Sequence, residues 1–85
     1  MEVTVYGPLR GATGEKTVTV DFDGGTVSDA LGALVAAYPR AADHLYDEGA
    51  LTTGIRVSVD GRTADPDDDC PADADLTVHP PLRGG

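Results

Sequence analysis

Residues 26–38 read TVSDALGALVAAY, and the packing of the whole chain depends on this segment. Its apolar positions are Val27, Ala30, Leu31, Leu34, Val35 and Tyr38. Their spacing places them in one stripe on a helix of about 3.6 residues per turn. Thr26 and Asp29 have the spacing of a capping box, with Asp in place of the usual Glu or Gln, and Pro39 favours an end to the helix. The segment predicts one amphipathic helix from residue 27 to about Tyr38.

Two segments before the helix have the period-2 alternation of half-buried strands. Residues 2–9 place Val3 and Val5 on one face, and residues 17–22 alternate in the same way. Between them, residues 10–16 hold two glycines among small and polar side chains, which is typical of a loop. The N-terminal part of the chain therefore predicts a β-hairpin with a long connection.

The segments after the helix predict shorter elements. In order, we expect a helical turn over residues 41–46, a loop over 47–54, a strand over 55–59, a short strand over 62–64, a solvated acidic connection over 65–75 and a last strand over 76–79. Asp60 and Gly61 suit the positive φ angles of a two-residue hairpin turn between the strands over residues 55–59 and 62–64. Pro80 and Pro81 end the last strand, because proline has no N–H to donate to a sheet ladder.

This order of elements predicts an α+β fold. A hairpin followed by one helix and further strands gives a mixed sheet of four or five strands, with the helix packed on one face. A chain of 85 residues has room for one compact domain, and a domain of this size leaves little space for a large internal cavity. We expect residues 1–80 to form the domain and residues 81–85 to extend from it as a tail.

The charge of the chain limits the classes of molecule that it can bind. The formal net charge is -9, from 15 Asp and Glu against 6 Lys and Arg, which disfavours binding to the phosphates of a nucleic acid. The acidic residues are mostly Asp, and Lys16 is the only lysine. This composition resembles that of proteins from salt-loving archaea; the alternative is that the acidity selects a basic partner.

The compartment is indicated by what the sequence lacks. It has no apolar run of the roughly 18 residues that a spanning helix needs, and its acidic start is not typical of a secretory signal. The single cysteine, Cys70, cannot build a disulfide framework or a thiolate metal cage. We expect a soluble protein in the cytoplasm, without a membrane partner.

Candidate catalytic groups are few. The acidic run over residues 65–69 lacks the glycine and the distal glutamate of a calcium loop. His44 and His79 have no Cys or Ser at a motif spacing, and the acidic neighbours of Cys70 oppose thiolate formation. Residues 11–14 lack the lysine of a phosphate-binding loop. We expect no metal site, no bound cofactor and no catalytic site in this chain.

The last six residues are Pro80-Pro81-Leu82-Arg83-Gly84-Gly85. Because the sequence stops at the diglycine, we expect a free carboxylate on Gly85. At about 3.3 Å per residue, residues 81–85 can carry that carboxylate roughly 15 Å beyond the fold. The prolines keep the start of the tail extended, and glycine has no Cβ, so the walls of a partner can close around its backbone. Such a tail fits a channel that the folded body cannot enter.

Three features of the sequence occur together in one family. The opening strand is followed by Leu9-Arg10 and Gly14, the helix begins Thr26-Val27-Ser28-Asp29-Ala30-Leu31, and the sequence ends Pro-Pro-x-x-Gly-Gly. The whole chain thus resembles the ubiquitin-like β-grasp family, in particular the small subunit of molybdopterin synthase, the thiamine sulfur carrier and the small archaeal modifier proteins. The resemblance implies a β-grasp fold and a haloarchaeal source.

The resemblance also implies a carrier rather than an enzyme. The Gly85 carboxylate would become an acyl-adenylate in the site of an enzyme of the ubiquitin-activating type, which supplies the ATP and magnesium. A persulfide would then give a thiocarboxylate, a sulfur donor for molybdopterin or for tRNA thiolation, and the large subunit of molybdopterin synthase would be a further partner. A lysine of a target protein would instead give an isopeptide bond. The chain alone is expected to be a monomer.

The family assigns roles to residues at the tail and on the sheet. Gly85 is the point of covalent attachment, and the enzyme recognises Gly84, Arg83, Leu82, Pro81 and Pro80. For docking we expect Tyr6, Val59 and His79 on the exposed sheet face, with Leu9 and Arg10 near the tail. His79 departs from the family, which usually has an aromatic residue before the two prolines.

Two questions stay open at the level of sequence. The chain could instead be an interaction module that binds a partner through its sheet face and does not use the tail. Leu82-Arg83-Gly84-Gly85 also matches the end of ubiquitin, which favours protein modification, but sulfur transfer and modification share one activated intermediate. Lys16 is either the one internal site at which a chain of modifiers could grow or a polar loop residue.

Overall fold

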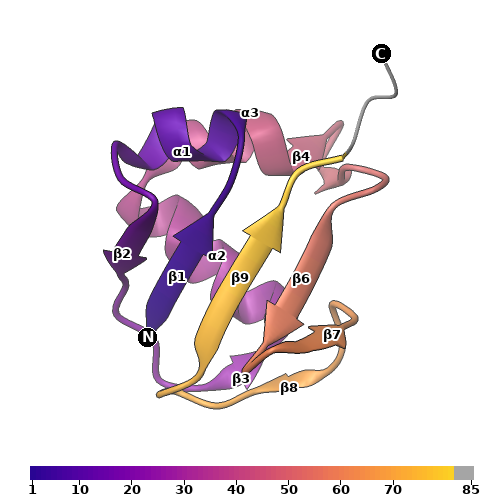
Figure 1. Cartoon of the computed structure of the whole chain (residues 1–85). Helices are drawn as coiled ribbons and strands as arrows, with labels where there is room; N and C mark the ends of the chain where they lie inside the picture. The colour runs from indigo at the N-terminus through magenta and orange to yellow at the C-terminus, as the bar shows by residue number, and fades with distance from the viewer. Residues whose placement is uncertain (82–85) are drawn as a thin grey trace.

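A mixed sheet forms one layer of the protein in a computed structural model that describes residues 1–81 (Figure 1). Its strands are β1 (Glu2–Val5), β2 (Thr17–Thr19), β6 (Arg56–Val59), β7 (Arg62–Ala64) and β9 (Asp75–His79). The five strands lie in the order β2-β1-β9-β6-β7. β1 is parallel to β9, and the other neighbouring pairs are antiparallel. The predicted α+β class with a mixed sheet is confirmed.

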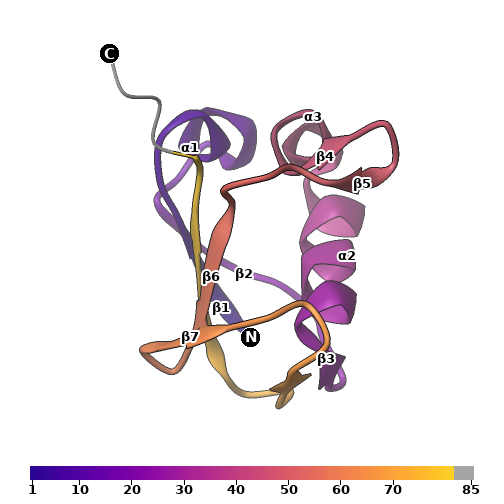
Figure 2. The same cartoon turned by 90° about the vertical axis from the view of Figure 1, so that its right-hand side faces the viewer.

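Four helical segments and two small strand pairs complete the fold. The helical segments are α1 (Pro8–Thr13), α2 (Val27–Ala37), the 3-10 turn η1 (Pro39–Ala41) and α3 (Ala42–Leu45). The small pairs join β3 (Gly25–Thr26) to β8 (Asp69–Cys70) and β4 (Tyr46–Asp47) to β5 (Ala50–Leu51). Figure 2 shows α2 against one face of the sheet, with α1 and α3 across one end of the layer between them.

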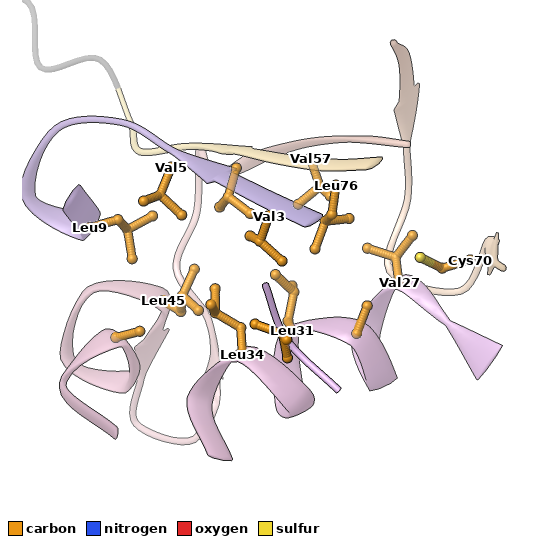
Figure 3. Packing of buried hydrophobic residues seen from close by; sticks show 14 of the residues in the cluster. Val3, Val5, Leu9, Val27, Leu31, Leu34, Leu45, Val57, Cys70 and Leu76 are labelled. Carbon is orange, nitrogen blue, oxygen red and sulfur yellow. The ribbon is translucent and has the colours of Figure 1, made fainter. Parts of the chain in front are cut away.

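The core lies between the sheet and α2. Figure 3 shows the side chains that meet there, which include Val3, Val5, Val57 and Leu76 from the strands, Val27, Leu31 and Leu34 from α2, and Leu9, Leu45 and Cys70 at the ends. The strand residues alternate as their sequence predicts: Val3 and Val5 are fully buried, whereas Glu2 is exposed. α2 uses the apolar stripe predicted for it, which confirms that one helix covers one face.

The start of α2 is fixed by the predicted capping box. The backbone N–H of Asp29 donates to Oγ1 of Thr26 over 3.1 Å, and the backbone N–H of Thr26 donates to Oδ2 of Asp29 over 3.0 Å. Two of the N–H groups that a helix start leaves without a partner are thereby satisfied. The helix ends at Ala37, with Tyr38 as its C-cap, one residue before the predicted end.

The acidic segment over residues 65–75 is largely exposed, as predicted, but it is more than a connection, because it contains β8 and its backbone accepts hydrogen bonds from the start of α2. The backbone carbonyl of Asp68 accepts the N–H of Val27, and the carbonyl of Pro66 accepts the N–H of Ser28, both over 2.9 Å. The Asp68 carboxylate in turn accepts the N–H of Asp65 over 2.8 Å. These carbonyls serve the first turn of α2, where backbone N–H groups need acceptors and negative charge is favoured.

The predicted loop over residues 10–16 is replaced in part by α1, and the first strand ends at Val5 rather than at residue 9. Pro8 stands in the first turn of this helix, where its fixed φ is compatible and its missing N–H is not needed. Gly14 closes the helix with φ 82 and donates its N–H to the carbonyl of Arg10. Six residues are too few to show helical periodicity in the sequence, and burial of Leu9 holds them in place.

Two connections were predicted with different success. Asp60 and Gly61 have φ angles of 50 and 83, so they form the two-residue turn expected between β6 and β7. The segment predicted as a loop over residues 47–54 contains the short pair β4 and β5 instead.

None of the helices that residues 1–81 form is long and apolar enough to span a membrane.

Replacing Thr26 with Ala removes the capping acceptor and is expected to lower the free energy of unfolding by about 1 kcal/mol. Ser28→Ala is the matched control on the same helical turn, because only the backbone N–H of Ser28 is used and Ala retains it. Urea denaturation followed by circular dichroism measures both variants. Equal destabilisation by the two substitutions would contradict the role of the capping box.

Candidate functional site

The described chain ends just after the middle strand of the sheet. β9 has β1 on one side and β6 on the other, and its last residue is His79. Pro80 and Pro81 follow, and we refer to these two prolines as the tail root. They lie at the end of the sheet that is covered by α1 and α3 (Figures 1 and 2). The predicted tail residues Leu82, Arg83, Gly84 and Gly85 lie outside the described residues.

A row of four side chains crosses the outer face of the sheet beside the tail root. We call Lys16, Tyr6, His79 and Arg56 the ring row. The rings of Tyr6 and His79 are stacked, with centroids 4.7 Å apart and planes 5° apart. Nζ of Lys16 lies 5.1 Å from the centroid of the Tyr6 ring, and Arg56 is in register with His79. The row thus has two stacked rings between two cationic side chains.

The rest of the outer face is polar. Cross-strand register places a band of hydroxyl side chains next to the ring row, formed by Thr17, Thr4, Thr77, Ser58 and Thr63. Glu2 and Asp75 pair further along the same strands. Among the described residues Tyr6, at 37% exposure, is the large hydrophobic residue that is exposed. The outer face is therefore apolar only near the tail root.

Of the five predicted docking residues, three lie on the surface and two pack in or against the core. Tyr6 and His79 share the outer face as predicted, and Arg10 is exposed on α1. Leu9 is 0% exposed, because it packs in the core beneath α1, so its predicted place on a docking surface is wrong. The prediction for Val59 is also wrong. Val59 pairs with the buried Leu76, so its side chain points to the helix side of the sheet and packs against the core.

Two surface grooves meet at the tail root. The first, of about 710 Å³, is lined by Tyr6, Gly7, Thr53, Gly54, Arg56, His79, Pro80 and Pro81. The second, of about 540 Å³, is lined by Pro8, Asp43, His44, Tyr46, Asp47, Thr52, Pro80 and Pro81. The prolines border both grooves, so a partner that grips the tail meets the ring row on one side and the α3 region on the other. Gly7, Thr53 and Gly54 were not predicted as site residues; a glycine next to a strand end was the only signal for Gly7 and Gly54, and Thr53 had none.

The described residues contain no group of three or more His, Cys, Asp or Glu side chains that could hold a metal ion. Cys70 is buried beside α2, and burial, followed by the negative charge of Asp60, raises the pKa of its thiol above the ordinary value of 9.0. A thiol in that state is a weak nucleophile.

Comparisons with known proteins identify the family and the fold. No family model matches the chain. Small archaeal modifier protein 1 of Haloferax volcanii is 38% identical over 87 residues, covering 100% of both chains. Its crystal structure matches with a TM-score of 0.89 at 36% identity, over 100% of this chain and 98% of that chain. A chain in the Amycolatopsis orientalis BexX/CysO complex matches with a TM-score of 0.79 at 25% identity, over 99% and 98% of the two chains.

A mixed sheet that holds one main helix, with a tail after a central strand, defines a ubiquitin-like protein of the β-grasp class. The full-length identity to the Haloferax protein is more specific than the fold. On that evidence the chain belongs to the small archaeal modifier proteins.

The buried thiol makes stability depend on alkaline pH. Because the folded state raises the pKa of Cys70, it holds that proton more tightly than the unfolded chain does. This contribution is complete below the ordinary pKa of 9.0 and is lost as the pH rises through the folded value. Above pH 9.0 the free energy of unfolding should fall more steeply for the wild type than for Cys70→Ala. Parallel pH profiles of the two proteins in urea denaturation would contradict the shift.

Proposed function

We propose that this chain is a carrier and modifier whose Gly85 carboxylate is adenylated in trans by an enzyme of the ubiquitin-activating type. The observation that carries the proposal is the full-length match to a small archaeal modifier protein, together with a diglycine after the tail root. The described body offers one free cysteine, which is buried, and no candidate metal cluster. The reactive group of the proposal is accordingly the tail carboxylate.

Activation is needed because a carboxylate is a poor electrophile. The enzyme binds ATP and magnesium, the Gly85 carboxylate attacks the α-phosphate, and pyrophosphate leaves. In the acyl-adenylate that results, AMP is a good leaving group. Attack by a persulfide releases AMP and gives an acyl disulfide, and a second thiol of the partner cleaves its S–S bond, forming a disulfide and leaving a Gly85 thiocarboxylate, a sulfur donor for molybdopterin synthesis or tRNA thiolation. Attack by a lysine amine of a target protein gives an isopeptide bond.

The body would present the tail to the enzyme. The ring row is the one part of the outer sheet face where aromatic surface is exposed, and it borders the groove beside Pro80 and Pro81. Aromatic side chains flanked by cations are favourable anchors in protein interfaces. Tyr6, His79 and Arg10 therefore remain docking residues in the proposal, joined by Lys16 and Arg56. The reaction uses ATP, which is consistent with a place in the cytoplasm.

Deleting Gly84 and Gly85 is expected to abolish adenylation while the fold is retained, because the terminal carboxylate then belongs to Arg83 and ends about 7 Å short of the site, and the core is untouched. The assay is ATP–pyrophosphate exchange with purified activating enzyme, and thermal unfolding checks the fold. Intact mass of the wild type first verifies that Gly85 carries a free carboxylate.

The matched control for the deletion is Gly84→Ala with Gly85→Ala, which keeps the length and the carboxylate but adds two Cβ atoms. It should bind and react more slowly than the wild type, because a channel closed around glycine has no space for them. Exchange that continues unchanged after the deletion would overturn the proposal. It would favour the second candidate, a non-covalent interaction module, whose partner binding does not need the tail.

The two fates of the acyl-adenylate leave different masses. Sulfur transfer replaces one oxygen of Gly85 with sulfur, and intact mass of protein isolated from its own cells detects that change. Modification leaves Gly-Gly on target lysines after trypsin, because Arg83 precedes the diglycine and is the cleavage site. We expect at least one of these products. Cells that contain neither, while the activating enzyme is active, would contradict the proposed function.

A further inference from the structure

Two glycines approach the tail root from opposite sides. Gly7 follows β1 and Gly54 precedes β6, and these two strands border β9. A Cβ atom added at Gly7 would lie 2.9 Å from Cγ of Pro80, and one added at Gly54 would lie 3.0 Å from Cβ of Pro81. Non-bonded carbon atoms pack at about 3.5–4.0 Å, so neither position can hold a side chain unless the proline moves.

Backbone conformation alone does not account for these two glycines. Gly7 and Gly54 have φ angles of +62 and +92, which favour glycine. Gly49 and Gly61 have φ angles of +82 and +83, but an added Cβ there would meet no atom within 4 Å. Gly49 and Gly61 are thus needed only for their turns. Gly7 and Gly54 in addition leave space for a proline ring.

The prolines depend on this packing because the sheet cannot hold them. The described pairing of β9 with β1 ends at Val78, and its pairing with β6 ends at His79. Neither Pro80 nor Pro81 has an N–H to extend the ladder. The φ angle of each proline is fixed by its ring, so the positions of the two rings, together with ψ of Pro81, constrain the direction of the chain after Pro81.

We propose that Gly7 and Gly54 are positioning residues for the tail: their missing side chains form a seat for Pro80 and Pro81 that sets the direction in which residues 82–85 leave the body. This inference rests on the proposed function, since a tail that reacts in another protein's site needs a defined exit. If fully extended, four residues would span about 13 Å, and a rotation of about 10° at the root would then move the last residue by about 2 Å. A misplacement of about 1 Å at a reacting group can lower a rate by roughly 100-fold.

The exit direction can be measured without any activating enzyme. The substitution Leu82→Cys introduces a second thiol into the full chain, and a nitroxide is attached to it. Cys70 is buried and should not react, and intact mass verifies that a single label is present. Paramagnetic broadening of backbone amide signals is compared at Thr53, on the β6 side of the tail root, and at Arg10, on the α1 side. Gly54→Ala should push Pro81 away from the β6 side and reduce broadening at Thr53 relative to Arg10. Gly7→Ala should change the ratio in the opposite direction.

Gly61→Ala is the matched control, because it introduces the same strain at positive φ and touches neither proline. It should leave the broadening ratio within twofold of the wild type. Thermal unfolding of all variants verifies that each is folded under the conditions of the measurement. An identical ratio in the wild type, Gly7→Ala and Gly54→Ala would overturn the inference.

A double substitution separates contact with the proline from backbone strain. Pro80→Ala removes Cγ, the atom that an added Cβ at Gly7 would meet at 2.9 Å, and leaves Cβ at 3.9 Å. Gly7→Ala should therefore change the broadening ratio less in the Pro80→Ala protein than in the wild type. An effect of equal size in both backgrounds would assign it to strain alone and contradict the seat.

Kinetics with the activating enzyme connect the seat to function. Gly54→Ala should lower kcat for adenylation by about 10-fold with little change in KM, because the proposed docking residues are unchanged and the carboxylate arrives misplaced. Gly61→Ala should stay within twofold of the wild type in both constants. Unchanged kcat in Gly54→Ala, despite an altered broadening ratio, would contradict the positioning role. If the wild type is not adenylated at all, the proposed function fails, and the broadening experiment still decides whether the seat exists.

Discussion

The parallel pairing of β1 with β9 is the contact on which the rest of the structure depends. It joins the first strand of the chain to the last, with Val3 beside Leu76 and Val5 beside Val78. These four residues are buried against α2, so the pairing and the core form together. Because β6 pairs with the other edge of β9, the strand that leads to the tail lies between two neighbours. The root of the tail is therefore held by the centre of the fold.

Local signals in the sequence were sufficient where a pattern was long or chemically specific. The helix over α2 has an apolar stripe and a capping box, and the turn at Asp60 and Gly61 has residues that tolerate positive φ. α1 and the β4–β5 pair gave no comparable pattern, because elements of a few residues are shorter than the periods that identify them. Their stability comes from tertiary burial, which a sequence does not display directly.

The candidate site shows the same division between local and long-range information. Side chains alternate along β6, so Val59 lies on the same face as the buried Val57. The sequence pattern therefore already indicated the inner face for Val59, and its assignment to the outer face overlooked that pattern. By contrast, Lys16 and Arg56 join Tyr6 and His79 only through the register of four strands. The seat formed by Gly7 and Gly54 likewise requires two loops that are far apart in sequence. The diglycine ending was visible in the sequence, but the surroundings of the tail root were not.

The position of β9 also determines how the protein responds to mechanical load. A pull on the tail acts along β9, whose hydrogen bonds to β1 and β6 lie across that direction on both edges. Such a force loads the two ladders in shear, so many bonds have to break together rather than one after another. A strand at the edge of the sheet could be peeled away from a single neighbour. If the protein is joined to another molecule through this tail, as we propose, tension directed along β9 would therefore meet two ladders in shear rather than one edge to peel.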